Sequence, residues 1–381
     1  MLYELTEEEA MLRDMVRDFA AKELEPKAEH YDQTETFPHE HFEKMGELGL
    51  MGMLIPEEYG GSDMGLFAEV LAVEELAYSC ASTAITMAVH NSLVTGPIVR
   101  CGNEEQKQEF LPGLASGERL GAYCLTEPNT GSDAASLEMT AVKKGDKYVL
   151  NGTKSWISTA GVSGVMLLFA RTDKDAAKKK EGISAFIVTP DLPGLTIGKE
   201  EKKLGLRASN TVQIILEDCE VPADRLLGEE NTGFKIALNA LSAGRIGVAA
   251  QALGIHRACL DESVRYSQER HQFDQPIANF QAIKVKIADM AMELEAARWL
   301  VWQAAKLRDA GQPCIKEASM AKLFAAEAAN RAAREAVQIH GGYGYMKEYK
   351  VERLFRDAKV LEIYEGTSEI QRLVISREVL A

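Results

Sequence analysis

The stretch from Phe234 to Arg270 contains no proline and repeats its apolar residues at helical spacing. It predicts one very long helix, because proline is the residue that most reliably breaks a helix interior. Two alanine- and leucine-rich stretches follow at 281–310 and 315–340, with a glycine- and proline-containing break between them. Long helices joined by short connections favour an antiparallel arrangement, so residues 231–381 are predicted to form a C-terminal four-helix bundle domain.

The first 120 residues are predicted to form an N-terminal helical domain. Thr6 and Glu9 have the spacing of a capping box, which marks the start of a helix. This first helix is expected to stop at Pro26. Further helices are expected at 67–79, 81–100 and 104–115.

Residues 121–230 have a different texture, because their apolar residues alternate with a period close to two. Gly145-Asp146 and Asn151-Gly152 predict turns between short strands. The block has the size of a small barrel, so it is predicted to be a middle β-barrel domain. The whole chain is therefore expected to be an α+β protein in which helices, strands and helices follow one another.

Composition and charge restrict the kind of function. The formal net charge of −15 argues against nucleic acid as a partner. No apolar run has the length of a membrane-spanning helix, and the acidic N-terminus is unlike a signal peptide, so a cytoplasmic protein without membrane insertion is expected. The six cysteines are scattered, as reduced thiols would be. His39-Glu40-His41 is read as an exposed polar turn, and no metal is expected.

Two segments of the middle region could surround a ligand. Tyr123–Asp133 leads from a strand into a turn rich in Pro, Asn, Gly and Ser, where free N–H groups could meet a ring edge or a phosphate. Taken alone, an ordinary surface turn is the favoured interpretation. Trp156 lies among small hydroxyl residues and could cover a planar ligand, but a tryptophan that fills the core is an equal alternative.

Two segments of the last region add to this set. The glycines of Gln338–Tyr345 can end a long helix, and they also allow close approach of the backbone to a ligand. Glu365 precedes Gly366 and a residue, Thr367 or Ser368, that can cap a last helix. Its apolar neighbours would raise the pKa of a carboxylate, as a base that removes a proton from carbon requires. Alone, a surface glutamate is the simpler interpretation.

Together these segments resemble the acyl-CoA dehydrogenase family over essentially the whole chain. There is no G-x-G-x-x-G, Walker, H-E-x-x-H or G-x-S-x-G motif that would indicate another common site. The resemblance implies FAD at the junction of the domains and a homotetramer built as a dimer of dimers. It also implies an acyl-CoA substrate and an electron-transferring flavoprotein as electron acceptor. Asn91–Leu93 and Asp218–Cys219 look closest to the short-chain, butyryl-type branch.

The resemblance also implies individual roles. Tyr123 to Ser132 should line the flavin, with Thr126 near its pyrimidine edge, Ser132 near the pyrophosphate and Ser158 close to N5. A second group matches the part of the bundle that holds the adenosine diphosphate of a neighbouring subunit's FAD. The residues implied to bind the cofactor are Tyr123, Leu125, Thr126, Gly131, Ser132, Trp156, Ile157, Ser158, Arg270, Gln272, Phe273, Gln281, Gln338, Gly341, Gly342, Thr367 and Glu369. Those implied to bind substrate are Ser132, Ser242, Arg245, Tyr364 and Gly366.

Glu365 matches the catalytic base of the family. The implied reaction is α,β-dehydrogenation of a short- to medium-chain acyl-CoA to the trans-2-enoyl-CoA. In some relatives the base lies on the first helix of the bundle, where this chain has Gly244, which has no side chain to act. Two alternatives stay open: an acyl-CoA oxidase, for whose usual extra helical domain the chain has no room, and a non-catalytic scaffold of the same fold.

Overall fold

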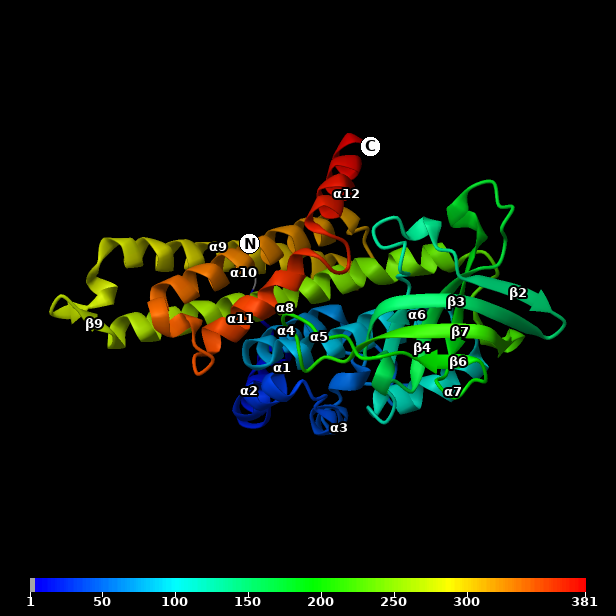
Figure 1. Cartoon of the computed structure of the whole chain (residues 1–381), viewed down its shortest axis with the longest axis horizontal. Coiled ribbons are helices and arrows are strands. Elements are labelled where there is room, and N and C mark those ends of the chain that lie inside the picture. Colours follow the sequence, from blue (N-terminus) through cyan, green and yellow to red (C-terminus); the bar gives the residue numbers. More distant parts are fainter. Residues whose placement is uncertain (1–3) are drawn as a thin grey trace.

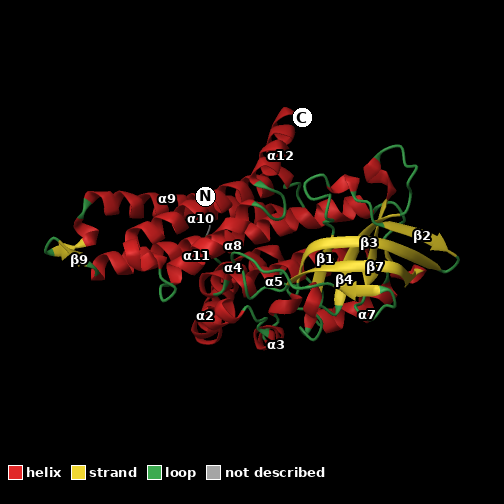
Figure 2. Cartoon of the chain, in the orientation of Figure 1, coloured by secondary structure: helices red, strands yellow, loops and turns green. Residues whose placement is uncertain are grey.

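The computed structural model describes residues 4–381; its N-terminal and C-terminal helical regions pack against each other, and the sheet lies at one end of them (Figure 1, Figure 2). The elements along the chain confirm the predicted order of helices, strands and helices. The helices of the N-terminal region are α1 (Glu7–Phe19), α2 (Glu25–Thr34), α3 (His39–Glu47), α4 (Gly65–Ser79), α5 (Ala81–Ala88), α6 (Gly96–Cys101) and α7 (Glu104–Ala115). The strands of the middle region are β1 (Gly121–Cys124), β2 (Thr140–Lys144), β3 (Lys147–Ser158), β4 (Val165–Arg171), β5 (Ile183–Val188), β6 (Leu195–Ile197), β7 (Thr211–Pro222) and β8 (Leu226–Leu227).

The C-terminal region consists of long helices with a small hairpin at one end. Its elements are α8 (Gly233–Glu269), β9 (His271–Gln272), β10 (Gln275–Pro276), α9 (Gln281–Asp309), α10 (Ile315–His340), α11 (Lys350–Lys359) and α12 (Ser368–Leu380). The predicted long helix is confirmed, because α8 has 37 residues. Helix α10 packs against α8, α9 and α11, and α8 packs against α9 and α11, in agreement with the predicted bundle. Figure 1 shows the β9 hairpin at the end of the bundle away from the sheet.

The start of the chain confirms one prediction and corrects another. The side chain of Thr6 accepts a hydrogen bond from the N–H of Glu9 at 3.2 Å, and the Glu9 carboxylate accepts one from the N–H of Thr6 at 2.9 Å, which is the predicted capping box. The prediction that Pro26 ends the helical run is wrong. A π-helical segment, Ala20–Leu24, leads directly into α2, where Pro26 lies in the first turn. The π-helical turn just before Pro26, in which the N–H of Glu25 bonds to the carbonyl of Ala20, is the local adjustment that carries the helical run past the proline.

The sheet is not the closed β-barrel that the strand pattern predicted. Its strands follow the order β6-β7-β3-β2-β4-β5-β8, and β1 pairs in parallel with β4. No ladder joins β6 to β8 within residues 4–381. Both end strands are too short to close the sheet, since β6 has three residues and β8 has two. The start of α8 covers β5 instead, where Gly233 lies so close to Ser184 that a Cβ would come within 2.4 Å of its backbone.

The two predicted turns had different outcomes. Gly145-Asp146 does connect β2 to β3, and Gly145 has the positive φ of 65° that such a turn uses. Asn151-Gly152 is not a turn, because both residues lie inside β3, at a register shift against β7. Gly152 is required there by space: an added Cβ would lie 2.9 Å from the backbone of Met139.

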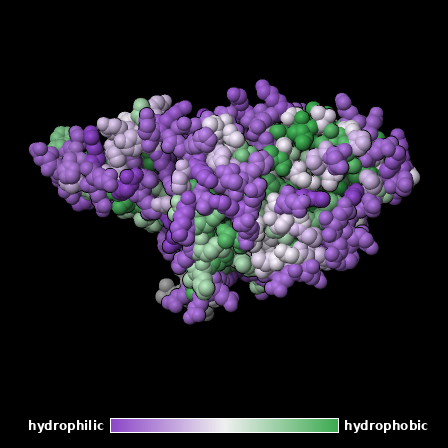
Figure 3. Space-filling model, turned by 90° about the horizontal axis from the view of Figure 1, so that it is seen from below, coloured by the Kyte–Doolittle hydropathy of each residue, from purple (hydrophilic) through white to green (hydrophobic). Residues whose placement is uncertain are grey.

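Helix α8 is the central element of the interior. By length and composition alone it could cross a membrane, but 83% of its most apolar window is buried inside the protein, as in the core helix of a folded domain. It packs on α4, whose residues are almost all buried, and on α10. On the face in Figure 3, hydrophilic side chains cover most of the bundle end, and apolar side chains gather in separate patches nearer the middle and the sheet.

Candidate active site

Glu365 lies in the short connection between α11 and α12, with a backbone that few residues adopt. Its φ is 51°, and the following Gly366 has a φ of 96°. Lys322 donates a hydrogen bond to the carbonyl of Gly366 at 2.8 Å, and Gln371 donates to the same oxygen at 2.9 Å. The hydroxyl of Tyr364 is hydrogen bonded to Gln251 of α8. The buried side chains of Lys322, Gln371 and Gln251 thus hold this strained loop. Such backbone strain often accompanies function.

The surroundings of Glu365 raise the pKa of its carboxyl group. Burial raises its pKa to about 7, against the opposing effects of the cations Lys322 and Arg245. Burial likewise lowers the pKa of Lys322 to about 8. Oxygen Oε2 of Glu365 has no hydrogen-bond partner within residues 4–381. The carboxylate is therefore poised to take up a proton near neutral pH, as a general base should be.

The glycine at position 244 is what leaves room for this carboxylate. A Cβ added to Gly244 would lie 2.0 Å from Oε2 of Glu365 and 2.7 Å from the side chain of Leu93. Helix α8 thus presents bare backbone to the carboxyl group. The glycine lacks a competing functional group, as the sequence indicated, and it also makes the position of Glu365 possible.

The segments around Tyr123 and Trp156 are joined by a buried ion pair that the sequence analysis missed. Lys154 is 0% exposed and lies 2.8 Å from the carboxylate of Glu127; its ammonium also donates to the carbonyl of Leu125 at 3.0 Å. The N–H of Ser155 donates to the carbonyl of Thr126 at 2.9 Å. The turn after β1 is thereby fixed against β3. Lys154 and Glu127 lie in the two segments identified from the sequence. Nothing in the sequence indicates that their side chains contact each other.

Trp156 does not fill the core. It lies at an irregularity in the pairing of β3 with β7, has a φ of 59°, and its side chain is 62% exposed. Its neighbour Ile157 is buried and Ser158 is half-buried. The core-filling alternative is therefore wrong, and the exposed indole is available to a planar ligand.

The residues near this indole fit a polar, planar group such as a flavin. Three hydroxyl groups, those of Thr130, Ser155 and Thr159, are buried without a hydrogen-bond partner in the part of the chain that the structure describes. Buried hydroxyls normally have partners, so these require a bound molecule or water. In the turn, Leu125 is buried and Thr126 half-buried, whereas Gly131 and Ser132 are exposed.

The predicted substrate residues of α8 lie inside the protein. Ser242 is buried and donates back to the carbonyl of Leu238 at 3.1 Å. The guanidinium of Arg245 is buried and donates to the hydroxyl of Ser319 at 3.3 Å, while its Nε has no partner within residues 4–381. Burial lowers the pKa of Arg245, and the charge of Glu365 opposes this shift. Burial raises the pKa of Tyr123 on β1, and the negative charge of Glu365 raises it further, so this predicted flavin residue lies within reach of the charge of Glu365.

A second group of predicted cofactor residues lies at the far end of the bundle. Arg270 ends α8, and its guanidinium lies over the ring of Tyr343 at 5.5 Å from the ring centre. Gln272 is in the β9 hairpin, and Phe273 next to it has a φ of 52° and an 86% exposed side chain. Between Arg245 and Arg270 the helix axis advances by about 38 Å at 1.5 Å per residue. This group therefore does not share a site with Glu365 in one chain.

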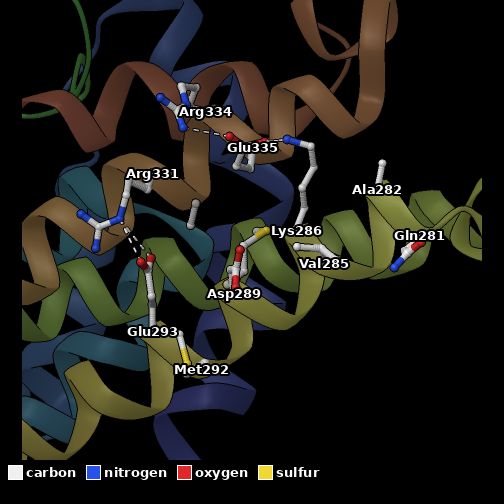
Figure 4. A pocket seen from close by; sticks show the side chains of 12 residues that line it. Gln281, Ala282, Val285, Lys286, Asp289, Met292, Glu293, Arg331, Arg334 and Glu335 are labelled. Atoms are coloured by element: carbon white, nitrogen blue, oxygen red, sulfur yellow. Dashed lines mark hydrogen bonds and ion pairs between the residues drawn. The ribbon is translucent and has the colours of Figure 1, made fainter.

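Gln281 lines a surface pocket between α9 and α10 (Figure 4). Ion pairs between Arg331 and Glu293, and between Lys286 and Glu335, cross from one helix to the other beside it. The pocket is open and holds charges of both signs. It therefore offers groups that could meet a polar ligand or another chain.

The remaining predicted cofactor residues lie either at the end of the bundle or in the loop and helix that follow Glu365. Gln338, Gly341 and Gly342 are exposed at the end of α10, where Gly341 has a φ of 61° and forms the predicted helix stop. Thr367 caps α12 by accepting from the N–H of Ile370 at 3.4 Å, as predicted, and Glu369 is exposed in the first turn of that helix.

Two further predictions concern metal sites and cysteines. No cluster of His, Cys, Asp or Glu that could hold a metal occurs among residues 4–381. His41 is buried in α3 with its Nδ1 3.1 Å from the hydroxyl of Thr83, so its reading as part of an exposed turn is wrong. All six cysteines are free, as predicted.

The fold, the buried Glu365 carboxylate, the exposed Trp156 indole and the unsatisfied hydroxyls are the features expected of an enzyme that binds a cofactor. The sequence models of the acyl-CoA dehydrogenase N-terminal, middle and C-terminal domains match residues 6–118, 122–219 and 231–380. The chain belongs to the acyl-CoA dehydrogenase family, whose members are FAD-dependent flavoproteins.

Individual relatives agree with this membership. An acyl-CoA dehydrogenase of Bacillus subtilis is 53% identical over 99% of both chains. The structure of butyryl-CoA dehydrogenase from Megasphaera elsdenii matches with a TM-score of 0.97 and 44% identity, covering all of both chains. A chain in a structure titled for the electron transferring flavoprotein of Acidaminococcus fermentans matches with a TM-score of 0.98 and 47% identity, again over both whole chains.

Proposed function

We propose that this protein dehydrogenates short- to medium-chain acyl-CoA thioesters to trans-2-enoyl-CoA, with Glu365 as the base. The observation that carries the proposal is the Glu365 carboxylate, which is buried against Gly244 and has a pKa of about 7. A carboxylate of ordinary acidity would be a weaker base toward a carbon acid. The butyryl-CoA dehydrogenase of Megasphaera elsdenii supports the short-chain assignment.

The residues of the chain divide the chemistry in a simple way. Glu365 removes the proton from the carbon next to the thioester carbonyl and holds it on its carboxyl group. The N–H of Glu365 makes no hydrogen bond within residues 4–381, so it is free to polarise the thioester oxygen. Bound FAD supplies the acceptor for the hydride that leaves the β-carbon. Trp156, Ile157 and Ser158, with the turn from Tyr123 to Ser132, would hold that cofactor.

The electron acceptor and the assembly are part of the proposal. We propose that an electron-transferring flavoprotein receives the electrons, which the Acidaminococcus fermentans structure supports. The bundle-end residues Arg270, Gln272, Phe273 and Gln281 lie too far from Glu365 to bind the same molecule. We propose that they hold the adenosine end of a neighbouring subunit's FAD in a homotetramer. Domain boundaries at 120 and 230, a cytoplasmic location and no insertion into membranes complete the proposal.

Anaerobic titration of the FAD-loaded protein tests the reaction. Saturated acyl-CoAs from C4 to C16 are added one at a time, and loss of the visible flavin absorbance reports dehydrogenation. We expect bleaching by the shorter chains and, for Glu365→Gln, retained FAD with a loss of bleaching rate of at least about a thousandfold. Full-rate bleaching by Glu365→Gln contradicts the assignment of the base. Rapid reoxidation of the reduced enzyme by air alone would instead indicate an acyl-CoA oxidase.

A further inference from the structure

Glu69 is a buried carboxyl group that the reaction described above does not use. It lies on α4, its side chain is 0% exposed, and neither carboxyl oxygen has a hydrogen-bond partner within residues 4–381. No lysine or arginine donates a hydrogen bond to it in this part of the chain. Buried carboxyl groups are rarely left in this state, because an unsatisfied polar group destabilises the fold.

The carboxyl groups of Glu69 and Glu365 both lie against the same face of α8. A Cβ added to Gly244 would lie 2.0 Å from Oε2 of Glu365, and one added to Gly247 would lie 4.0 Å from Oε1 of Glu69. Residues three apart lie on one side of a helix and about 4.5 Å apart along its axis. The two carboxyl groups therefore flank a stretch of α8 that carries no side chain at either position. The nearest other side chain is that of Ala88, whose Cβ would lie 3.3 Å from the Cβ added at Gly247.

The charge state of Glu69 follows from the same surroundings. Burial raises its pKa well above the ordinary value, and the carboxylates of Asp309 and Glu365 raise it further. Both effects favour the uncharged carboxylic acid, which can donate and accept a hydrogen bond. A substrate hydroxyl group beside the uncharged acid could accept a hydrogen bond from its O–H and donate one to its carbonyl oxygen. An alkyl chain would leave the acid unsatisfied, and a carboxylate would add a negative charge with no cation beside it.

We propose that Glu69 is a specificity-determining residue at the inner end of the acyl pocket and selects acyl chains that carry an uncharged hydrogen-bonding group, such as a hydroxyl. The inference rests on the proposed function, which places the reacting carbons at Glu365. Glu365 is half-buried and Glu69 fully buried, so a chain that enters past Glu365 continues inward along Gly244 and Gly247 toward Glu69. The preferred substrates are then acyl-CoAs with a polar group a few carbons beyond the reacting bond.

The test compares pairs of thioesters with equal numbers of non-hydrogen atoms in the acyl group. These are 5-hydroxypentanoyl-CoA against hexanoyl-CoA, and 6-hydroxyhexanoyl-CoA against heptanoyl-CoA. The measured quantity is the ratio of kcat/KM for the hydroxylated chain to that for the alkyl chain. It is determined for the wild type, for Glu69→Leu, which removes the hydrogen-bonding groups, and for Glu69→Gln, which keeps a donor and an acceptor.

We expect a wild-type ratio above one that falls about tenfold or more in Glu69→Leu, because a pocket built to bind a hydroxyl discriminates strongly against its absence. The ratio in Glu69→Gln is expected to stay within about threefold of the wild type. An equal ratio in wild type and Glu69→Leu overturns the inference. If Glu69→Leu does not retain FAD, a wild-type ratio below one overturns it as well. Failure of the proposed function gives a different result, since no thioester then bleaches the wild-type flavin.

Discussion

The residues around Glu365 and those at the end of the bundle have opposite characters. Around Glu365 the side chains are buried, the loop is held by Lys322 and Gln371, and a single chain supplies every group. At the bundle end, Phe273 is exposed and the glycines at 341 and 342 have open space where a Cβ would be. The first region is formed by buried residues of one chain, whereas the second exposes an aromatic side chain and glycine backbone at the surface.

The largest expected effect comes from closing the space beside the base. We predict that Gly244→Ala lowers kcat/KM by about a hundredfold or more, because the new Cβ would occupy the position of the Glu365 carboxylate and displace it. The matched change at the bundle end is Gly342→Ala, whose Cβ meets nothing within 4 Å. Steady-state kinetics and FAD content of both variants check this contrast. Equal activities of the two variants would remove the distinction between the regions.

A smaller effect is expected from Arg270→Ala, and mixing subunits tests whether two chains share a site. We predict that Arg270→Ala weakens FAD retention by about tenfold, since an arginine that binds phosphate typically contributes on this scale. Co-expression of Arg270→Ala with Glu365→Gln should restore part of the activity, because some sites then receive Glu365 from one subunit and Arg270 from its neighbour. The measurement is activity per bound FAD in the purified mixed oligomer. Activity no higher than in a mixture of the separately purified variants contradicts the shared site.

The smallest expected effect tests how the loop of Glu365 is controlled. Lys322 lowers the pKa of Glu365 by its charge, so Lys322→Met should raise that pKa and reduce kcat/KM at pH 7 by about tenfold or less. Since the base must be deprotonated, wild-type kcat/KM should rise with pH through about 7.

The rise in Lys322→Met should occur at higher pH, and Lys322→Arg should restore the wild-type profile. A purely structural role of Lys322 would lower activity equally at every pH. It would then leave the midpoint of the profile unchanged.

Much of the fold follows from local patterns. The length of α8, the cap formed by Thr6 and Glu9, and the turn at Gly145 depend on neighbours in the sequence, which is why the sequence predicts them. The open edges of the sheet do not, since they depend on how β6 and β8 are placed in three dimensions. Asn151-Gly152 has the composition of a hairpin turn, but the close approach of Met139 demands a glycine inside a strand.

The candidate site shows the same division. Glu365 and Trp156 stand in motifs that a resemblance can locate, and the structure tests their surroundings rather than their roles. Lys154, Lys322 and Glu69 were not predicted, because each matters through a partner, or the lack of one, that is distant in the sequence. A lysine in an alanine-rich helix gives no sign of whether it points to water or toward a catalytic loop.

One consequence of the unbroken helix α8 concerns its length. It carries Gly244 and Arg245 near one end and ends at Arg270, so its length sets the distance between the surroundings of Glu365 and the bundle-end residues. One inserted residue would move the far end by about 1.5 Å and turn it by about 100°. Under the proposed sharing of FAD between subunits, changes of length between these positions should therefore be far less tolerable than substitutions.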